Sequence, residues 1–285
     1  MKNFYVDFHT HTKRSDGQLS PEELVIAAKN AGIGVLAITD HNMLCDELGD
    51  LQLKHPDIKL IDGVEISTMY GETEIHVIGL DVDKNNQYLR DTLALNTDDR
   101  RPYINAILQK LRELGIDLGT YDDICSLTPD SIRIGRMHIA KAMKHRGFVE
   151  SVDEAFDRYI GAFGQRLAYV ENPHRYITIE KAVDAILASG GIPVLCHLYY
   201  YSLTEEESEA LVAKFKALGG EKAALEVAYS RYDEATRKKL ANLAKKYNLR
   251  SSAASDFHGF EERVSLDNHF PYEYYESLFG TEKHT

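Results

Sequence analysis

The sequence has no tryptophan, only three cysteines and seven prolines among its 285 residues, and no long apolar run. Without an apolar run of about 20 residues, no membrane-spanning helix is expected. Cys45, Cys125 and Cys196 are odd in number and far apart, which argues against a disulfide framework and a Cys-x-x-Cys metal site. The N-terminus leads directly into an apolar segment, without the parts of a signal peptide. These absences predict a cytoplasmic protein with reduced thiols.

Positive charge is also scarce, because the chain has 33 Lys and Arg residues but 45 Asp and Glu residues, which gives a formal net charge of −12. Such a chain is not expected to coat long duplex nucleic acid through a basic surface. It can still bind a small anionic substrate if bound dications reverse the charge inside a pocket. The composition therefore favours small phosphorylated substrates over long duplexes.

The first part of the chain predicts a strand, a helix and a second strand. Residues 4–11 form a short apolar run that ends in two histidines. Ser20 is the expected N-cap of a helix in which Glu23 closes a capping box and which Gly32 ends. The continuous apolar run 35–39 is typical of a buried parallel strand. Such units build parallel sheets or barrels.

The rest of the chain continues this alternation with one interruption. A hairpin is expected at 60–67 and 74–80, followed later by helices at 179–189, 205–218 and 233–247 and strands at 192–197, 223–227 and 250–255. Between these parts, helical patterns at 98–114, 137–146 and 152–160 occur without a strand. No regular structure is expected beyond Phe260. We therefore predict an α/β barrel over 1–84 and 173–285, with a helical insertion at 85–172 that caps the active site.

His9 and His11 end the first apolar run, and on a strand both imidazoles would point to the same side and could hold one metal ion. Alone, the pair is weak evidence in a chain with 12 histidines. Further histidines and carboxylates occur at or just beyond the ends of other predicted strands, where parallel barrels carry their active sites. Each has an ordinary structural explanation, but together they indicate a metal site. The candidate ligands are His9, His11, Asp16, His41, Glu65, His76, His197, Asp256 and His258.

Several short motifs resemble the PHP (polymerase and histidinol phosphatase) family of metal-dependent phosphoesterases. They are Phe8-His9-Thr10-His11, Ser15-Asp16-Gly17, Ile38-Thr39-Asp40-His41-Asn42, Gly63-Val64-Glu65-Ile66-Ser67, Ile75-His76-Val77-Ile78-Gly79 and Ser255-Asp256-Phe257-His258-Gly259. The resemblance covers essentially the whole chain and implies a distorted (β/α)7 barrel with two or three divalent ions. The layout is similar to the branch that removes phosphate from nucleotides, including 3′,5′-nucleoside bisphosphates and the 5′ end of short RNA. That branch has a helical insertion with a Gly-Arg-Pro-His segment, which Gly135-Arg136-Met137-His138 resembles.

Carried over by position, the resemblance divides the candidate ligands among three ions. One ion would be held by His9, His11, Glu65 and Asp256, a second by Glu65, His76 and His197, and a third by Asp16, His41 and His258. Asp40 would be a ligand or would orient an imidazole. Mixed nitrogen and oxygen ligands suit Mn²⁺, our first choice, with Fe or Zn²⁺ as alternatives.

This arrangement predicts hydrolysis without a nucleophilic side chain. Dications lower the pKa of bound water to about 7, so that a metal-bound hydroxide can attack phosphorus in line with the leaving alkoxide. Asp40, Arg136 and His138 are the expected catalytic residues, with Arg136 gripping a phosphate through its bidentate fork and His138 acting as donor or proton source. Arg101, its neighbour Arg100 and Tyr199 are further candidates for substrate binding, although they could equally be surface residues.

Two positions depart from this branch, which has proline where this chain has Met137 and Leu198. Neither change removes a ligand, so specificity is expected to differ more than catalysis. Two other functions remain open: a histidinol-phosphate phosphatase, and a metal-binding accessory module without activity of its own. Catalysis by the Cys196 thiol is disfavoured, because the neighbour of His197 on a strand should point into the core.

Overall fold

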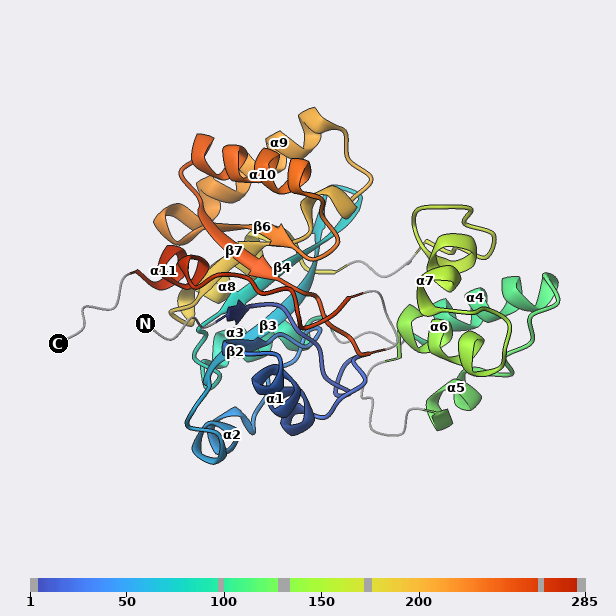
Figure 1. Ribbon diagram of the computed structural model, residues 1–285. Helices are drawn as coiled ribbons and strands as arrows, with labels where there is room; N and C mark the ends of the chain where they lie inside the picture. The colour runs from blue at the N-terminus through green and yellow to red at the C-terminus, as the bar shows by residue number, and fades with distance from the viewer. Residues whose placement is uncertain (1–4, 97–99, 128–133, 172–175, 261–263, 281–285) are drawn as a thin grey trace.

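The computed structural model describes residues 5–96, 100–127, 134–171, 176–260 and 264–280, and within them seven strands form one sheet. In sheet order the strands are β1 (Tyr5–Asp7), β2 (Ile33–Ile38), β3 (Lys59–Tyr70), β4 (Thr73–Leu80), β5 (Ile192–Leu195), β6 (Ala224–Tyr229) and β7 (Arg250–Ala254). Backbone hydrogen bonds from Phe8 N to Ala253 O and from Asp256 N to His9 O join the two ends of the sheet. The sheet is therefore a nearly closed barrel, as predicted (Figure 1).

Strand β4 runs against both of its neighbours, whereas the other adjacent strands are parallel. The predicted hairpin turns at Gly71, whose φ of 60° suits glycine. Because β4 is reversed, its first half meets the mouth that the other strands reach with their C-terminal ends. His76 in β4 and Glu65 in β3 are consequently neighbours at this mouth, with His76 Nδ1 only 2.8 Å from Glu65 Oε1.

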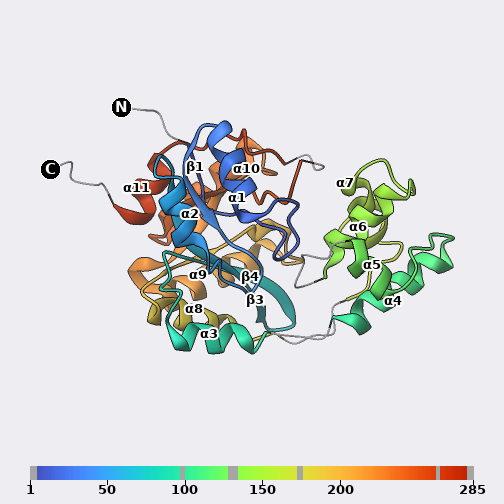
Figure 2. The same cartoon turned by 90° about the horizontal axis from the view of Figure 1, so that it is seen from below.

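Helices surround the barrel, as Figures 1 and 2 show. They are α1 (Pro21–Asn30), α2 (Leu48–Lys54), α3 (Gln87–Ala94), α8 (Ile179–Ala188), α9 (Glu205–Gly219), α10 (Glu234–Lys246) and α11 (Glu273–Phe279). The predicted capping box of α1 is confirmed, because the Ser20 hydroxyl accepts from Glu23 N and the Glu23 carboxylate accepts from Ser20 N. Within the described ranges, no helix combines the length and apolar character needed to cross a membrane.

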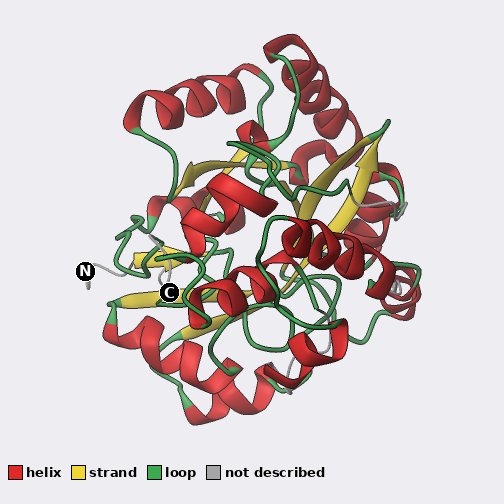
Figure 3. Cartoon of the chain, turned by 90° about the vertical axis from the view of Figure 1, so that its right-hand side faces the viewer, coloured by secondary structure: helices red, strands yellow, loops and turns green. Residues whose placement is uncertain are grey.

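The inserted segment forms a second helical body, which lies to the right of the barrel in Figure 1. It contains α4 (Arg101–Glu113), α5 (Tyr121–Leu127), α6 (Arg136–His145) and α7 (Val152–Ala155), which continues into a π-helical turn at Phe156–Ile160. Its buried apolar residues form their own cluster between Tyr103 and Ala168. In Figure 3, which looks from this side, helices and loops lie in front of the strands.

Helix α3 lies inside the predicted insertion but packs with the barrel. Leu89 and Leu93 of α3 belong to the same buried cluster as Ile186 of α8. We therefore propose that the inserted unit begins after α3 instead of at residue 85. The predicted starts at Phe4 and Asp98 lie outside the described residues.

The expectation that no regular structure follows Phe260 is wrong, because Glu273–Phe279 forms helix α11. Tyr275 and Leu278 lie three positions apart, and both are buried where α11 packs against β7. The helix has only seven residues and is rich in aromatic side chains, which have low helix propensity. Tertiary packing therefore stabilises a segment whose local sequence gives little signal.

Candidate active site

All nine candidate ligands lie at one mouth of the barrel, in four overlapping groups whose ligand atoms are within 4.8 Å of one another. The groups are His9, Glu65, Cys196 and His197; His11, Asp16, His41 and His258; His9, His11 and Asp256; and His41, Glu65 and His76. Several ligands follow directly after the strands β1, β2, β5 and β7. Positive φ angles of 30° at His197 and 58° at Asp256 turn the chain at two of these strand ends. Strained backbone of this kind is characteristic of functional sites.

Glu65 is at the centre of these groups and is almost fully buried. Its two carboxylate oxygens lie 2.8–3.4 Å from ring nitrogens of five histidines: His9, His11, His41, His76 and His197. Burial alone would raise the pKa of Glu65, but the nearby imidazoles hold it well below its usual value. Glu65 is therefore a carboxylate that can be shared between neighbouring cations.

Carboxylates behind the cluster fix the orientation of several ligands. Glu226 Oε2 accepts from His9 Nδ1 at 3.0 Å, and its Oε1 accepts from the backbone N–H of His197 at 2.8 Å. The hydroxyl of Tyr229 donates to Asp256 Oδ2 at 2.8 Å. These bonds leave His9 Nε2 and Asp256 Oδ1 facing each other at 3.3 Å. A carboxylate behind a histidine is the usual outer support of a metal ligand.

Glu226 was missed by the sequence analysis, although a signal was present. It is a charged residue within the otherwise apolar strand β6 and is completely buried. A carboxylate in such a position requires a hydrogen-bonding partner in the interior. The identity of that partner, His9, could not be read from the sequence because the two residues are 217 positions apart.

The donor set fits divalent ions. Glu65 Oε2 and His41 Nδ1 are buried 3.0 Å apart, yet neither atom has a hydrogen-bond partner among the described residues. His11 Nδ1 is also buried without a hydrogen-bond partner among the described residues. Buried polar atoms without partners are costly, and a cation among them would satisfy these lone pairs. The site contains three acidic ligands and six imidazoles, which suits a cluster of hard or borderline cations.

Asp40, expected as a ligand, an imidazole orienter or a catalytic group, holds the loop that carries Asp16. Its Oδ1 accepts from Thr12 N at 2.8 Å and Ser15 Oγ at 2.5 Å, and its Oδ2 accepts from Thr12 Oγ1 at 2.6 Å. Burial raises the pKa of Asp40, which these hydrogen bonds oppose. The loop closes tightly at Gly17, where a Cβ atom would lie 2.4 Å from the carbonyl oxygen of His11.

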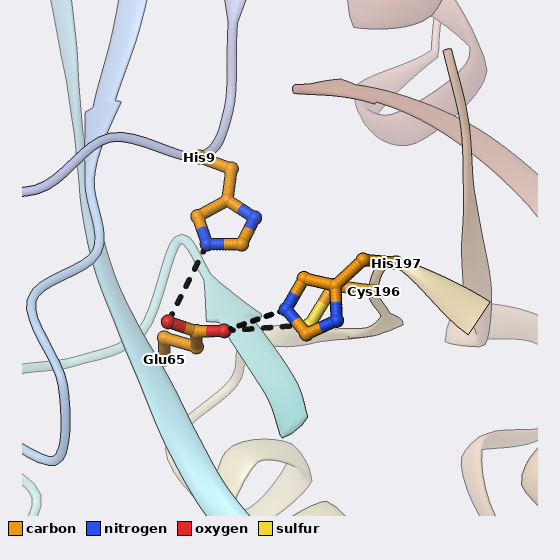
Figure 4. Close-up of side chains that lie close together, drawn as sticks. All are labelled: His9, Glu65, Cys196 and His197. Carbon is orange, nitrogen blue, oxygen red and sulfur yellow. Dashed lines mark hydrogen bonds and ion pairs between the residues drawn. The ribbon is translucent and has the colours of Figure 1, made fainter. Parts of the chain in front are cut away.

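Cys196 is buried in the core, as predicted, and its side chain also lies beside the candidate ligands (Figure 4). Its Sγ is 3.8 Å from Glu65 Oε1 and donates to the carbonyl oxygen of His76 at 3.2 Å. Strand β5 ends at Leu195 and His197 has a left-handed backbone, so regular strand alternation does not extend over Cys196 and His197. Burial and the nearby carboxylates raise the pKa of the thiol well above its usual value, which argues against a thiolate nucleophile.

A cavity of about 800 Å³ opens above the cluster, between the barrel and the insertion. Arg100 and Arg136 line it from the insertion, and the charge of Glu74 lies close to both guanidinium groups. The buried Nε of Arg100 has no hydrogen-bond partner among the described residues. His138 is 2% exposed, and its Nδ1 accepts from Gly135 N at 3.0 Å, so that it caps its own helix.

Two predicted substrate contacts lie elsewhere. Arg101 pairs with Asp122 at 2.9 Å on the outer face of α4, so the cavity-facing arginine is its neighbour Arg100. Tyr199 lines a separate hollow of about 460 Å³, whereas Tyr200 and Tyr201 line the main cavity. The sequence could not show which of two adjacent residues faces the cavity, because the exact residue at which each helical segment begins was not known.

Comparison with known proteins agrees with this geometry. Residues 7–174 match the sequence profile of the PHP domain. The chain belongs to the PHP family. The chain is similar to the 5′-3′ exoribonuclease Rnm of Salmonella typhimurium. The two are 35% identical over 258 residues, which cover 88% of this chain and 84% of that protein. The 3′,5′-nucleoside bisphosphate phosphatase of Chromobacterium violaceum is 28% identical over 264 residues, or 89% and 87% of the two chains.

Solved structures show the same architecture. An amidohydrolase from Chromobacterium violaceum, determined with bound sulfate and no metal, has a TM-score of 0.79 and 29% identity, and the match covers 91% of this chain and 89% of that one. A candidate metal-dependent phosphoesterase from Bifidobacterium adolescentis has a TM-score of 0.78 over 96% of this chain and 94% of that one, at 24% identity. The second comparison supports the fold alone. The predicted family and barrel are thus confirmed.

We predict that Glu226→Gln weakens metal binding by about 10–100-fold, the usual effect of losing an outer partner of a metal ligand. Glutamine has nearly the same shape, but it removes the negative charge that faces His9 Nδ1. Metal titration of the chelator-treated protein would measure the change. Glu209→Gln is the control, because Glu209 lies on the outside of α9 and pairs with Lys246. Equal metal affinity in wild type and Glu226→Gln would contradict the assigned role.

Proposed function

We propose that this protein is a metal-dependent phosphoesterase that hydrolyses phosphomonoesters of small nucleotides. The substrate would be a nucleoside 5′-monophosphate, a 3′,5′-bisphosphate or the 5′ end of a short oligonucleotide. The observation that carries this proposal is the convergence of nine nitrogen and oxygen donors beneath a cavity that Arg100 and Arg136 line. The exoribonuclease and bisphosphate phosphatase names of the relatives support the same substrate class.

The nine donors would hold two or three divalent ions, with Mn²⁺ as our first choice and Fe or Zn²⁺ as alternatives. When bound, such ions supply an activated water and neutralise charge on the phosphoryl oxygens. The chain itself provides the orientation of the ligands. Glu226 fixes the ring of His9, Tyr229 fixes the carboxylate of Asp256, and Asp40 fixes the loop of Asp16.

The insertion would supply the phosphate-binding groups. Arg136 lines the cavity at the start of α6 and can donate two parallel N–H bonds to a phosphate. Burial lowers the pKa of His138 to about 4, so this residue is neutral at pH 7. Its bond from Gly135 N supports a positioning role, in which it would shape the turn that carries Arg136. Because the insertion covers the cluster, it would limit the size of the substrate.

A phosphate-release screen tests this function directly. The Mn²⁺-loaded protein is expected to release phosphate from nucleoside 5′-monophosphates, 3′,5′-bisphosphates or short 5′-phosphorylated RNA at least about tenfold faster than from histidinol phosphate, because the arginine-lined cavity suits a substrate with more than one anionic or polar part. Faster release from histidinol phosphate would favour the other phosphatase. Absence of release from every substrate with Mn²⁺, Fe²⁺ and Zn²⁺ would favour the accessory module.

A further inference from the structure

The three consecutive tyrosines after His197 occupy three different environments. The hydroxyl of Tyr201 accepts from His76 N and donates to Cys196 O, both at 2.9 Å, so this residue ties the strand ends together. Tyr199 faces the outer hollow, where Lys239 lies 5.2 Å from its ring centre. Tyr200 lines both the hollow and the main cavity, and its side chain is 39% exposed. Tyr200 is thus the tyrosine available to a ligand.

Phe163 meets Tyr200 across the cavity. Phe163 comes from the insertion and is 47% exposed, and the two ring centres lie 6.3 Å apart at an interplanar angle of 87°. Tyr229 and Tyr232 support Tyr200 from behind, at centre distances of 5.4 and 5.9 Å. The two exposed rings therefore form a fixed corner, with the face of one ring next to the edge of the other.

The charges of the cavity divide it into two ends. Arg100 and Arg136 lie together near Glu74 and Tyr103, and they suit an anionic group. Asp153, Asp157 and Arg231 lie near Tyr200, and Arg231 pairs with Asp153 at 3.0 Å, so that these three groups together carry a net negative charge. A flat uncharged ring is the chemical group that suits the Tyr200 end, because it can stack on aromatic faces without meeting like charge.

We propose that Tyr200 and Phe163 form a binding site for the nucleobase of the substrate. This inference rests on the proposed function and specifies which part of the nucleotide each region of the cavity holds. A base stacked on one ring would meet the edge of the other, while the phosphates lie toward the ligand cluster and the arginines. Ring faces do not distinguish one base from another, so the site would accept all bases. The barrel and the insertion each contribute one wall.

Equilibrium binding to the chelator-treated protein tests this site without turnover. The ligands are adenosine 5′-monophosphate and ribose 5-phosphate, which has a hydroxyl group in place of the base. In Tyr200→Ala, binding of the nucleotide is expected to weaken roughly 5- to 150-fold, which corresponds to the about 1–3 kcal/mol of one base–aromatic stack. Affinity for ribose 5-phosphate is expected to change less than about twofold. Phe163→Ala should show the same selectivity, and Tyr200→Phe should retain nucleotide binding.

Tyr199→Ala is the matched control, because Tyr199 is adjacent in sequence but faces the outer hollow. Equal weakening of both ligands in Tyr200→Ala would show that the ring only holds the cavity together, and would overturn the base site. Unchanged nucleotide affinity in both Tyr200→Ala and Phe163→Ala would also overturn it. If the base-dependent binding is found but no metal restores phosphate release, the base site stands and the hydrolase proposal fails.

Discussion

Asp256→Asn is expected to abolish most phosphate release, with a loss of about 10³-fold or more. Removing an outer partner of a metal ligand already costs about 10–100-fold, and Asp256 is a proposed ligand itself. Its Oδ1 lies 3.3 Å from His9 Nε2 and 3.2 Å from His11 Nε2, so the substitution removes a charge from the middle of the cluster. Rates of Mn²⁺-dependent phosphate release from the best substrate of the screen would measure the loss.

Asparagine is preferable to alanine here because its amide oxygen can still accept from the hydroxyl of Tyr229. The thermal unfolding midpoint of the variant should therefore remain close to that of wild type. His9→Ala is a second test, but it leaves the buried Glu226 carboxylate without its imidazole partner and is expected to destabilise the fold as well. Full activity in Asp256→Asn would disprove the proposed ligand set.

Arg136→Ala is expected to lower kcat/KM by about 10²–10³-fold, the effect typical of losing one hydrogen-bond donor that stabilises developing negative charge in a transition state. Arg136 is the first residue of α6, and it lines the cavity. Arg136→Lys should recover only part of the loss, because lysine keeps the charge but cannot form the bidentate fork. Initial rates over a range of substrate concentrations would separate the effects on kcat and KM.

Arg101→Ala provides the control for Arg136→Ala. Its guanidinium lies 4.4 Å from the ring centre of Tyr121 and pairs with Asp122 on the outer face of α4. We expect less than a twofold change in kcat/KM for Arg101→Ala. A large loss in this variant, or a small one in Arg136→Ala, would show that the substrate approaches a different face of the insertion.

The ligand cluster could be anticipated from the sequence because its signals are local. His9 and His11 follow an apolar run directly, and Asp256 and His258 follow another. In a parallel barrel such strand ends meet at one mouth, so the positions of the side chains follow from the order of the elements. The reversed strand β4 did not disturb this result, because the hairpin places His76 beside Glu65.

The features that were missed depend on contacts between distant residues or on a single backbone angle. Glu226 accepts a hydrogen bond from His9, which is distant in sequence, and α11 is stabilised by packing against β7. Cys196 is turned toward Glu65 because the chain leaves the strand conformation at His197. Neither long-range pairing nor the end of strand alternation has a signature in the local pattern of residues.

One carboxylate, Glu65, touches five imidazoles, and each of the four ligand groups contains at least one of them. An ion bound by the Glu65 carboxylate would change the electrostatic potential at the other ligand groups. By thermodynamic linkage, the affinities of the two or three proposed ions would then depend on one another. Metal loading should consequently follow a cooperative or anticooperative isotherm, and no single dissociation constant will describe how this centre fills.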